Sequence, residues 1–467
     1  MISKNQYIEI LNNGLSTGAD YAEIFIEDKT SEGISIENGK VETASIARSY
    51  GAGIRLLNKL QSVYGYTNNV TFKSLNNLVL SLAASFKGKR ILEINSLKVK
   101  SIKNKHPYLR SYNDVSNEEK INYLKKGEEI IRNYDKRIVR SRAGIAFNKH
   151  FVTIVSSKGY VYKDFKQRGR VVLLAVAMDQ GKIETAFNGP GALSGFEYFE
   201  KEIDIKKLAE ETAETAIKFL TAKECPSGKM PVVIGNGFGG VLFHEACGHS
   251  LEATAVAKKL SVFSDRLGQQ IASPIVTAID DGTITNGWGS NNIDDEGNKT
   301  EKTVLIKNGI LKSYLIDDFN GRRMNQKGNG ACRRESYKYE PTSRMSNTYI
   351  DNGKSTPEEI IKATKLGLYA KSFAGGSVNP ATGEFNFGCS EAYIIRDGKI
   401  CEPVRGATLI GTGEEILKNI DMVGNDLKRS QGMCGSASGS VPVDVGQPTI
   451  RVSEITVGGN GGELKWD

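Results

Sequence analysis

The sequence predicts an α+β fold in two domains, and three observations support this. At 467 residues the chain is about three times as long as a common single domain. Glycine (50 residues) is frequent and proline (11) is scarce, a balance that favours tight hairpins over flexible linkers. Helix and strand patterns alternate in the first half, whereas hairpin signals dominate the second. We expect an N-terminal α+β domain over residues 1–225 and a mostly antiparallel, β-rich domain over residues 226–467.

The expected elements of the first half follow from periodicity and turn chemistry. Amphipathic helices are expected from Ile8 onward and over residues 72–86, 116–134 and 203–220. Residues 21–27 and 33–37 have strand composition, as do residues 151–155 and 171–178. Asn38-Gly39 is a strong hairpin signal, because both residues adopt positive φ easily.

In the second half, the breaker residues Cys225-Pro226-Ser227-Gly228 end a helix and mark the domain boundary. The dipeptides Asn308-Gly309 and Asp397-Gly398 each separate two apolar runs, which predicts two further hairpins. Only three helices are expected here, over residues 239–259, 357–369 and 414–420.

Composition excludes several classes of protein. Hydrophobic residues make up 39% and charged residues 25% of the chain, which excludes a disordered polyampholyte and a membrane protein. The longest apolar run, residues 171–178, is too short to cross a bilayer, and the N-terminus lacks the apolar core of a secretory signal. Six cysteines without a Cys-x-x-Cys pair argue against a disulfide framework. We expect a cytoplasmic protein.

The net charge of +8 comes from one stretch: residues 87–149 hold 17 Lys and Arg against 7 Asp and Glu. This stretch includes an ordinary charged helix and lacks interleaved aromatic residues, so a solvated face is favoured over a nucleic-acid partner.

The strongest chemical signal is the segment from His244 to His249, which contains two of the four histidines of the chain. Glu245 directly follows the first, as in the His-Glu-x-x-His zinc helix, but here the histidines are five residues apart instead of four. In a regular α-helix a step of five leaves them about 140° out of alignment. A shared metal therefore requires a π-bulge, and Gly248 would ease the unwinding. Otherwise the two histidines simply form hydrogen bonds in a core.

A catalytic zinc commonly takes three protein ligands and a water. Cys247, Glu252 and the downstream cysteines are all candidates for the third ligand, and spacing does not choose among them.

The segment GGVLFHEACGHSLE (residues 239–252) resembles the metal-binding helix of the TldD/PmbA metallopeptidase family, in its TldD branch. Further blocks resemble the same family: RES at 334–336, PTSRMSNTY at 341–349, GATLIG at 406–411, MVGNDL at 422–427, GMCG at 432–435 and SVPVDVGQP at 440–448. The resemblance implies that His244, His249 and Cys434 bind Zn²⁺ and that Glu245 is the catalytic acid/base.

The resemblance also implies a metalloprotease that matures or degrades unfolded or small peptides inside a chamber built by two subunits. The expected assembly is a homodimer, or a heterodimer with a metal-lacking sister subunit. Such a peptide would bind as an extended strand along a sheet edge. Arg344, Asn347 and Tyr349 are the right residue types to stabilise the oxyanion.

Two alternatives remain open. Gly235-x-Gly237-x-x-Gly240 follows a predicted strand and matches a dinucleotide-binding pattern, which indicates a nucleotide-binding oxidoreductase. These glycines could instead allow a peptide backbone to approach the helix. The other alternative is a non-catalytic, peptide-holding subunit, although a structural metal site has no use for a general base such as Glu245.

Overall fold

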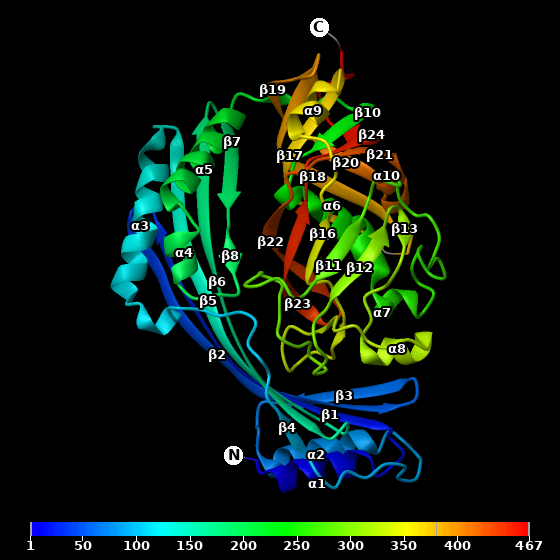
Figure 1. Cartoon of the computed structure of the whole chain (residues 1–467). Coiled ribbons are helices and arrows are strands. Elements are labelled where there is room, and N and C mark those ends of the chain that lie inside the picture. The colour runs from blue at the N-terminus through cyan, green and yellow to red at the C-terminus, as the bar shows by residue number, and fades with distance from the viewer. Residues whose placement is uncertain (1, 380, 466–467) are drawn as a thin grey trace.

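The computed structural model describes residues 2–379 and 381–465, and it confirms the α+β class (Figure 1). One long, curved sheet of the N-terminal half runs along the molecule, and the strands of the C-terminal half pack beside it. No helix in the described ranges is long and apolar enough to cross a membrane.

The N-terminal sheet has the order β3-β2-β1-β5-β6-β4, with β7 and β8 also paired to β6. Its strands are β1 (Tyr21–Glu37), β2 (Lys40–Asn58), β3 (Gln61–Thr67), β4 (Lys98–Lys100), β5 (Ile138–Ser156), β6 (Tyr160–Asp179), β7 (Lys182–Asn188) and β8 (Gly191–Ala192). The predicted hairpin at Asn38-Gly39 is confirmed, and both residues have positive φ. The two strands expected over 21–37 form one strand of 17 residues.

Helices cover this sheet at two places (Figure 1). They are α1 (Lys4–Gly14), α2 (Phe72–Ala83), α3 (Asn117–Tyr134), α4 (Glu197–Lys201) and α5 (Ile205–Phe219), and a 3₁₀ turn spans Tyr112–Asp114. The helices α3 and α5 share one apolar core with β5 and β6, whereas α1 and α2 close a second core at the other end of the sheet. Side-chain caps set the helix starts: Ser116 accepts from the backbone of Glu119 at α3, and Asp204 caps α5.

The C-terminal half contains two larger sheets and one small one. The first has the order β17-β10-β24-β20-β18-β19-β9 with β21 beside β24, and the second has the order β13-β12-β11-β16-β23-β22. Their strands are β9 (Lys223–Glu224), β10 (Gly228–Ile234), β11 (Ala278–Asp281), β12 (Lys302–Lys307), β13 (Ile310–Leu311), β16 (Asn347–Ile350), β17 (Leu366–Val378), β18 (Glu384–Arg396), β19 (Lys399–Arg405), β20 (Thr408–Thr412), β21 (Ile420–Val423), β22 (Lys428–Ser436), β23 (Gly439–Gln447) and β24 (Ile450–Gly458).

The pairings in this half are mostly antiparallel, and the two predicted hairpins form as β12–β13 and β18–β19. β14 (Cys332–Arg333) and β15 (Thr342–Ser343) form the small third sheet. The apolar faces of the two larger sheets contribute to one large core.

The helices of this half differ from the three expected. The helix expected over 239–259 is broken into short turns: a 3₁₀ turn (Gly237–Gly240), α6 (Val241–Phe243), a π-helical turn (His244–Gly248), a second 3₁₀ turn (His249–Leu251) and α7 (Ala253–Val256). α9 (Pro357–Lys362) ends early because the chain enters β17, and α10 (Gly413–Asn419) lies close to its predicted place. α8 (Asp318–Met324) was not predicted; Asp317 caps it, but it contains Gly321 and few apolar residues.

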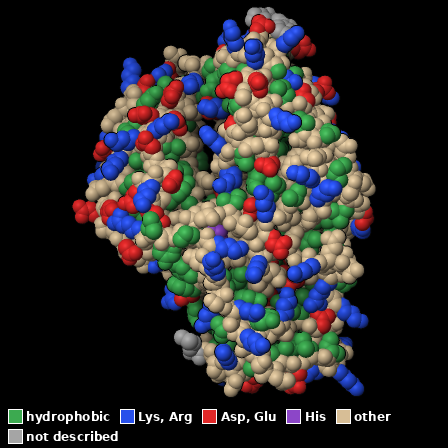
Figure 2. Space-filling view, in the orientation of Figure 1, with side chains coloured by type: hydrophobic (Ala, Val, Ile, Leu, Met, Phe, Trp, Pro, Cys, Tyr) green, Lys and Arg blue, Asp and Glu red, His purple; other side chains and the backbone are tan. Residues whose placement is uncertain are grey.

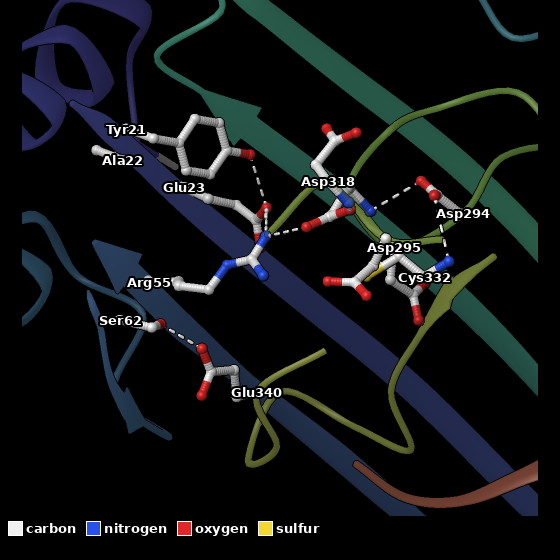
Figure 3. Close-up of polar contacts among 12 residues, drawn as sticks. Tyr21, Ala22, Glu23, Arg55, Ser62, Asp294, Asp295, Asp318, Cys332 and Glu340 are labelled. Carbon is white, nitrogen blue, oxygen red and sulfur yellow. Dashed lines mark hydrogen bonds and ion pairs between the residues drawn. The ribbon is translucent and has the colours of Figure 1, made fainter. Parts of the chain in front are cut away.

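Buried ion pairs join the two halves (Figure 3). Arg55 on β2 lies 3.0 Å from Glu23 of β1 and 2.6 Å from Glu296 of the C-terminal half. Arg334 reaches the other oxygen of Glu23 at 2.6 Å. All four side chains are at most 1% exposed. Because a buried charge is costly unless it is paired, this network favours one arrangement of the two halves.

Candidate metal centre

The π-helical turn over His244–Gly248 confirms the predicted distortion of the histidine segment. The backbone N–H of His249 donates to the carbonyl of His244, the i→i+5 bond that a π turn requires. As a result the two imidazole rings lie on the same side, with ring centroids 5.2 Å apart.

Gly248 has a role other than the predicted one. Its φ of −57° is ordinary helical backbone, so no special flexibility is needed there. A Cβ at this position would instead collide with the sulfur of Met345, which is fully buried. Gly248 therefore permits close packing under the turn.

Cys434 on β22 completes a cluster with the two histidines. Its Sγ lies 3.2 Å from Nε2 of His244 and 3.2 Å from Nε2 of His249. The three ligand atoms lie within 4.8 Å of one another, and no other such group of His, Cys, Asp and Glu occurs in residues 2–379 and 381–465. Since ideal tetrahedral zinc would separate sulfur and nitrogen by about 3.5 Å, this donor set fits the ion.

The other candidates for third ligand lie elsewhere. The Cys247 thiol donates to the carbonyl of Gly413 at 3.6 Å, away from the imidazoles. Glu252 contacts Nδ1 of His249, on the opposite side of the ring from Cys434.

The electrostatics of the cluster favour a cation. Burial alone would raise the pKa of the Cys434 thiol, but His244 and His249 beside it lower that pKa to about 3. Burial opposes a charge on His249, yet Glu252 and the Cys434 thiolate raise the pKa of its imidazole. The lowered pKa of Cys434 favours the thiolate, which is the form in which cysteine binds a metal ion.

Glu245 lies at the open side of the cluster. Its Oε2 is 3.6 Å from Nε2 of His249, and its side chain is 24% exposed, in contrast to the buried His244. A carboxylate in this position can reach both the cluster and a solvent molecule, as general acid–base chemistry requires.

The three residues considered as oxyanion donors are all buried. Arg344 is 0% exposed and donates to backbone carbonyls of the β22–β23 hairpin. The Asn347 amide donates to the carbonyl of Asp281 and the hydroxyl of Ser290. Tyr349 is 6% exposed. Arg344 and Asn347 therefore bind groups of the protein itself, and Arg344 adjoins the cluster through the carbonyl of Cys434 and through Glu252.

A cavity of about 720 Å³ lies along β22 and is lined by both halves of the chain. Its lining includes Arg429 and Gln431 of β22, Tyr198 of α4 and Trp288, whose indole donates to the Gly432 carbonyl of β22. Burial raises the pKa of Asp444 in its wall to about 6. Figure 2 shows that the surface is hollowed between the lobe of α3 and α5 and the C-terminal half. The sequence analysis did not predict the residues that line this cavity, because they come from segments that are far apart in the chain.

The glycines of the dinucleotide pattern pack against the chain itself. A Cβ at Gly235 would collide with the carbonyl of Lys371, and one at Gly240 would collide with the backbone of Gly446. β10 pairs with β24 antiparallel and leads into a short 3₁₀ turn, without the helix of a β-α-β unit. Neither the nucleotide site nor a close approach of substrate at Gly235 and Gly240 has support in this geometry.

Three family models match nearly the whole chain. They are the PmbA/TldA metallopeptidase domain 1 over residues 22–85, the central domain over 110–220 and the C-terminal domain over 227–459. The first two fall within the predicted N-terminal domain, and the third falls within the predicted β-rich C-terminal domain.

Curated relatives agree over similar lengths. A "Metalloprotease TldD homolog" of Buchnera aphidicola is 35% identical over 98% of both chains. Another of Haemophilus influenzae is 36% identical over 94% of this chain and 93% of that one. A metalloprotease of Methanocaldococcus jannaschii is 33% identical over 92% of this chain and 96% of that one.

Solved structures show the same fold at low identity. A crystal structure from Thermotoga maritima has a TM-score of 0.78 and 21% identity, and covers 94% of this chain and 96% of that one. TldE from Thermococcus kodakarensis has a TM-score of 0.76 and 17% identity, and covers 97% of this chain and 99% of that one.

Proposed function

Because the chain belongs to the PmbA/TldA family of metallopeptidases, we propose that it is a zinc-dependent peptidase that cleaves unfolded or small peptides. The observation that carries this proposal is the convergence of His244, His249 and Cys434, with Glu245 beside them. These residues come from two segments far apart in the chain, so their meeting is a property of the fold.

The donor set supports zinc as the metal. One thiolate and two imidazoles match the ligand types that zinc prefers. Three protein ligands leave a fourth position open for water, as in catalytic sites. When bound, zinc would polarise the scissile carbonyl of the peptide and lower the pKa of a bound water to about 7.

Glu245 then moves the proton. Its carboxylate accepts a proton from the attacking water while the water oxygen bonds to the scissile carbonyl carbon. It returns that proton to the leaving nitrogen as the C–N bond breaks, so the products are a carboxylic acid and an amine. Its partial exposure allows contact with water at both steps.

The position of β22 supports an extended peptide as substrate. β22 is the outer strand of its sheet and carries Cys434. A peptide added to this edge would bond through its main chain, which places little demand on side-chain identity. We propose that such peptides bind in an enclosed chamber formed by two subunits, which would exclude folded proteins.

The free edge of β2 supports a dimer. β3 pairs with Ala52–Asn58 only, so residues 40–51 of β2 have β1 on one side and no other strand of the described chain on the other. Ile46 is 72% exposed and Val41 48% exposed on this stretch. Long unprotected edges favour pairing with another chain, here a second copy or a metal-lacking sister subunit.

The cysteines support a cytoplasmic location. None of the six forms a disulfide, and Cys401 is exposed. Free thiols persist in reducing compartments.

The proposal is tested by elemental analysis of the purified protein together with digestion of an unfolded peptide library. We expect about one zinc per chain and cleavage by the wild type. Glu245→Gln should retain zinc and lose activity by at least about 100-fold. Glu415→Gln, the same change at an exposed position of α10, is the matched control and should keep both.

Three results would contradict parts of this proposal. Unchanged activity in Glu245→Gln would remove Glu245 from the mechanism. Wild-type protein that holds zinc without cleaving any peptide would indicate a peptide-holding subunit. Wild-type protein without metal would overturn the zinc site.

A further inference from the structure

We propose that Glu252 and Arg344 are positioning residues that hold two metal ligands, His249 and Cys434, in a single arrangement. This inference rests on the proposed metal site. It concerns residues outside the cluster itself, and it assigns Glu252 and Arg344 roles different from those of third ligand and oxyanion donor.

The first link joins Glu252 to His249. Oε2 of Glu252 lies 3.2 Å from Nδ1 of His249, and the carboxylate is only 6% exposed. In a neutral imidazole one nitrogen carries the proton and the other keeps a lone pair. A carboxylate at Nδ1 selects the tautomer protonated there, which leaves the lone pair of Nε2 facing Cys434 and the metal position.

The second link joins Glu252 to Arg344. Oε1 of Glu252 lies 3.9 Å from Nε of Arg344, and neither atom has a hydrogen-bond partner in the described residues. Arg344 is 0% exposed. A buried guanidinium and a buried carboxylate this close form an ion pair, because each would otherwise be an uncompensated buried charge.

The third link joins Arg344 to the strand that carries Cys434. Nη2 of Arg344 donates to the Cys434 carbonyl at 2.5 Å. Nη1 donates to the hydroxyl of Ser438 at 2.9 Å and to the carbonyl of Gly439 at 2.8 Å. The planar guanidinium therefore donates hydrogen bonds both to β22, which carries Cys434, and to the turn that follows it. A lysine ammonium lacks the second, rigidly spaced nitrogen that such simultaneous contacts require.

The three links form a continuous path from the ring of His249 to the backbone of Cys434, across 185 positions of sequence. His244 lacks an equivalent: its Nδ1 is buried without a hydrogen-bond partner in the described residues. The orientation of His244 therefore depends on packing, whereas that of His249 depends on Glu252.

The test measures the affinity of the metal-free protein for zinc alone, by competition with a chromophoric chelator. Glu252→Ala should bind zinc about 10–100-fold more weakly than the wild type. Glu252→Gln keeps an acceptor for Nδ1 but loses the charge facing Arg344, so its loss should be smaller. Arg344→Lys should also weaken binding, because lysine cannot hold the strand and the turn at once.

Two further measurements distinguish positioning of the metal ligands from a general effect on the structure. Thr342→Val removes a hydroxyl contact to the same Ser438 but leaves the contacts of Glu252 and Arg344 in place, and should bind zinc like the wild type. The absorption spectrum of the Co²⁺-substituted protein should change in Glu252→Ala and stay unchanged in Thr342→Val, because only the former alters a ligand's orientation.

This inference alone would be overturned if Glu252→Ala has the same zinc affinity and the same Co²⁺ spectrum as the wild type. The proposed function fails separately, if wild-type protein binds zinc but cleaves no peptide. Equal losses of affinity in Glu252→Ala and Thr342→Val would also overturn the inference, because they would reflect general loosening of the hairpin.

Discussion

At the scale of single residues, Gly248 shows how tightly the histidine turn is packed. Gly248→Ala would drive a methyl group into the sulfur of Met345, so we expect a loss of stability of about 1–3 kcal/mol and weaker zinc binding. Denaturant unfolding and zinc titration measure the two effects.

Met345→Ala provides the control for this prediction. It creates a cavity of its own, but it removes the atom with which the new methyl collides. Gly248→Ala should therefore cost less in the Met345→Ala background than in the wild type. An equal cost in both backgrounds would mean that backbone flexibility, and not packing, requires the glycine.

The site was partly predictable at this scale. His244, Glu245 and His249 are close in sequence, so the hypothesis of a shared metal was enough to predict the π turn that the structure contains. Cys434 is different, because spacing left Cys247, Glu252 and the later cysteines open. Only the family resemblance selected Cys434, and only the fold brings it within 3.2 Å of both imidazoles.

At the scale of elements, the β22–β23 hairpin determines where Cys434 lies. Gly439 begins β23 with φ of +83°, and a Cβ there would collide with Glu335. We expect Gly439→Ala to destabilise the protein by about 1–2 kcal/mol, since a side chain at positive φ is strained. We also expect weaker zinc binding, because the turn and Cys434 share the Arg344 contacts.

Gly435→Ala is the matched control on the same hairpin. A Cβ at Gly435 meets nothing within 4 Å, and its φ is not positive. Thermal unfolding and zinc affinity of this variant should match the wild type. If both alanine variants behave alike, the turn geometry does not position Cys434.

Elements with strong local signals were predictable. The Asn-Gly and Asp-Gly dipeptides correctly predicted three of the hairpins, because their positive φ is a local property of the residues. α8 was missed because its stability depends on a cap and on tertiary contacts rather than on periodicity. The apolar periodicity of residues 239–259 predicted one continuous helix. Apart from the π turn, it did not predict that residues 237–256 form a series of short turns.

At the scale of the whole molecule, the contact between the halves should depend on pH. Burial raises the pKa of Glu27 on β1 to about 7, and its Oε2 accepts from the backbone N–H of Tyr337 in the other half. The folded chain thus holds the Glu27 proton more tightly than the unfolded chain does. The stability this gives is complete below about pH 4.5 and is lost as pH rises through about 7.

Glu27→Gln should remove this dependence. Between pH 5 and pH 8 the wild type should lose up to about 3 kcal/mol more of its free energy of unfolding than the variant does. Denaturant unfolding at several pH values gives the comparison. Glu210→Gln on α5, where the carboxylate is exposed, should behave as the wild type. Parallel pH profiles for wild type and Glu27→Gln would contradict the assignment.

The β2 edge gives a prediction about assembly. Ile46→Lys places a charge on the unpaired stretch, and lysine at an edge opposes strand pairing. We expect sedimentation to show a dimer for the wild type and a monomer for this variant. Ile183→Lys on β7, which is 59% exposed, should leave the dimer intact. A dimer in all three proteins would place the interface elsewhere.

By itself the sequence determined the α+β class, three of the hairpins and, for two histidines that share a metal, the π turn between His244 and His249. Each of these follows from residues near one another in the chain, where periodicity and turn chemistry act. The tertiary structure alone decided that Arg344 donates to the Cys434 carbonyl, that Glu252 contacts His249 on the side away from Cys434, and that buried ion pairs join the halves. These depend on distances between segments remote in sequence, which local patterns do not encode.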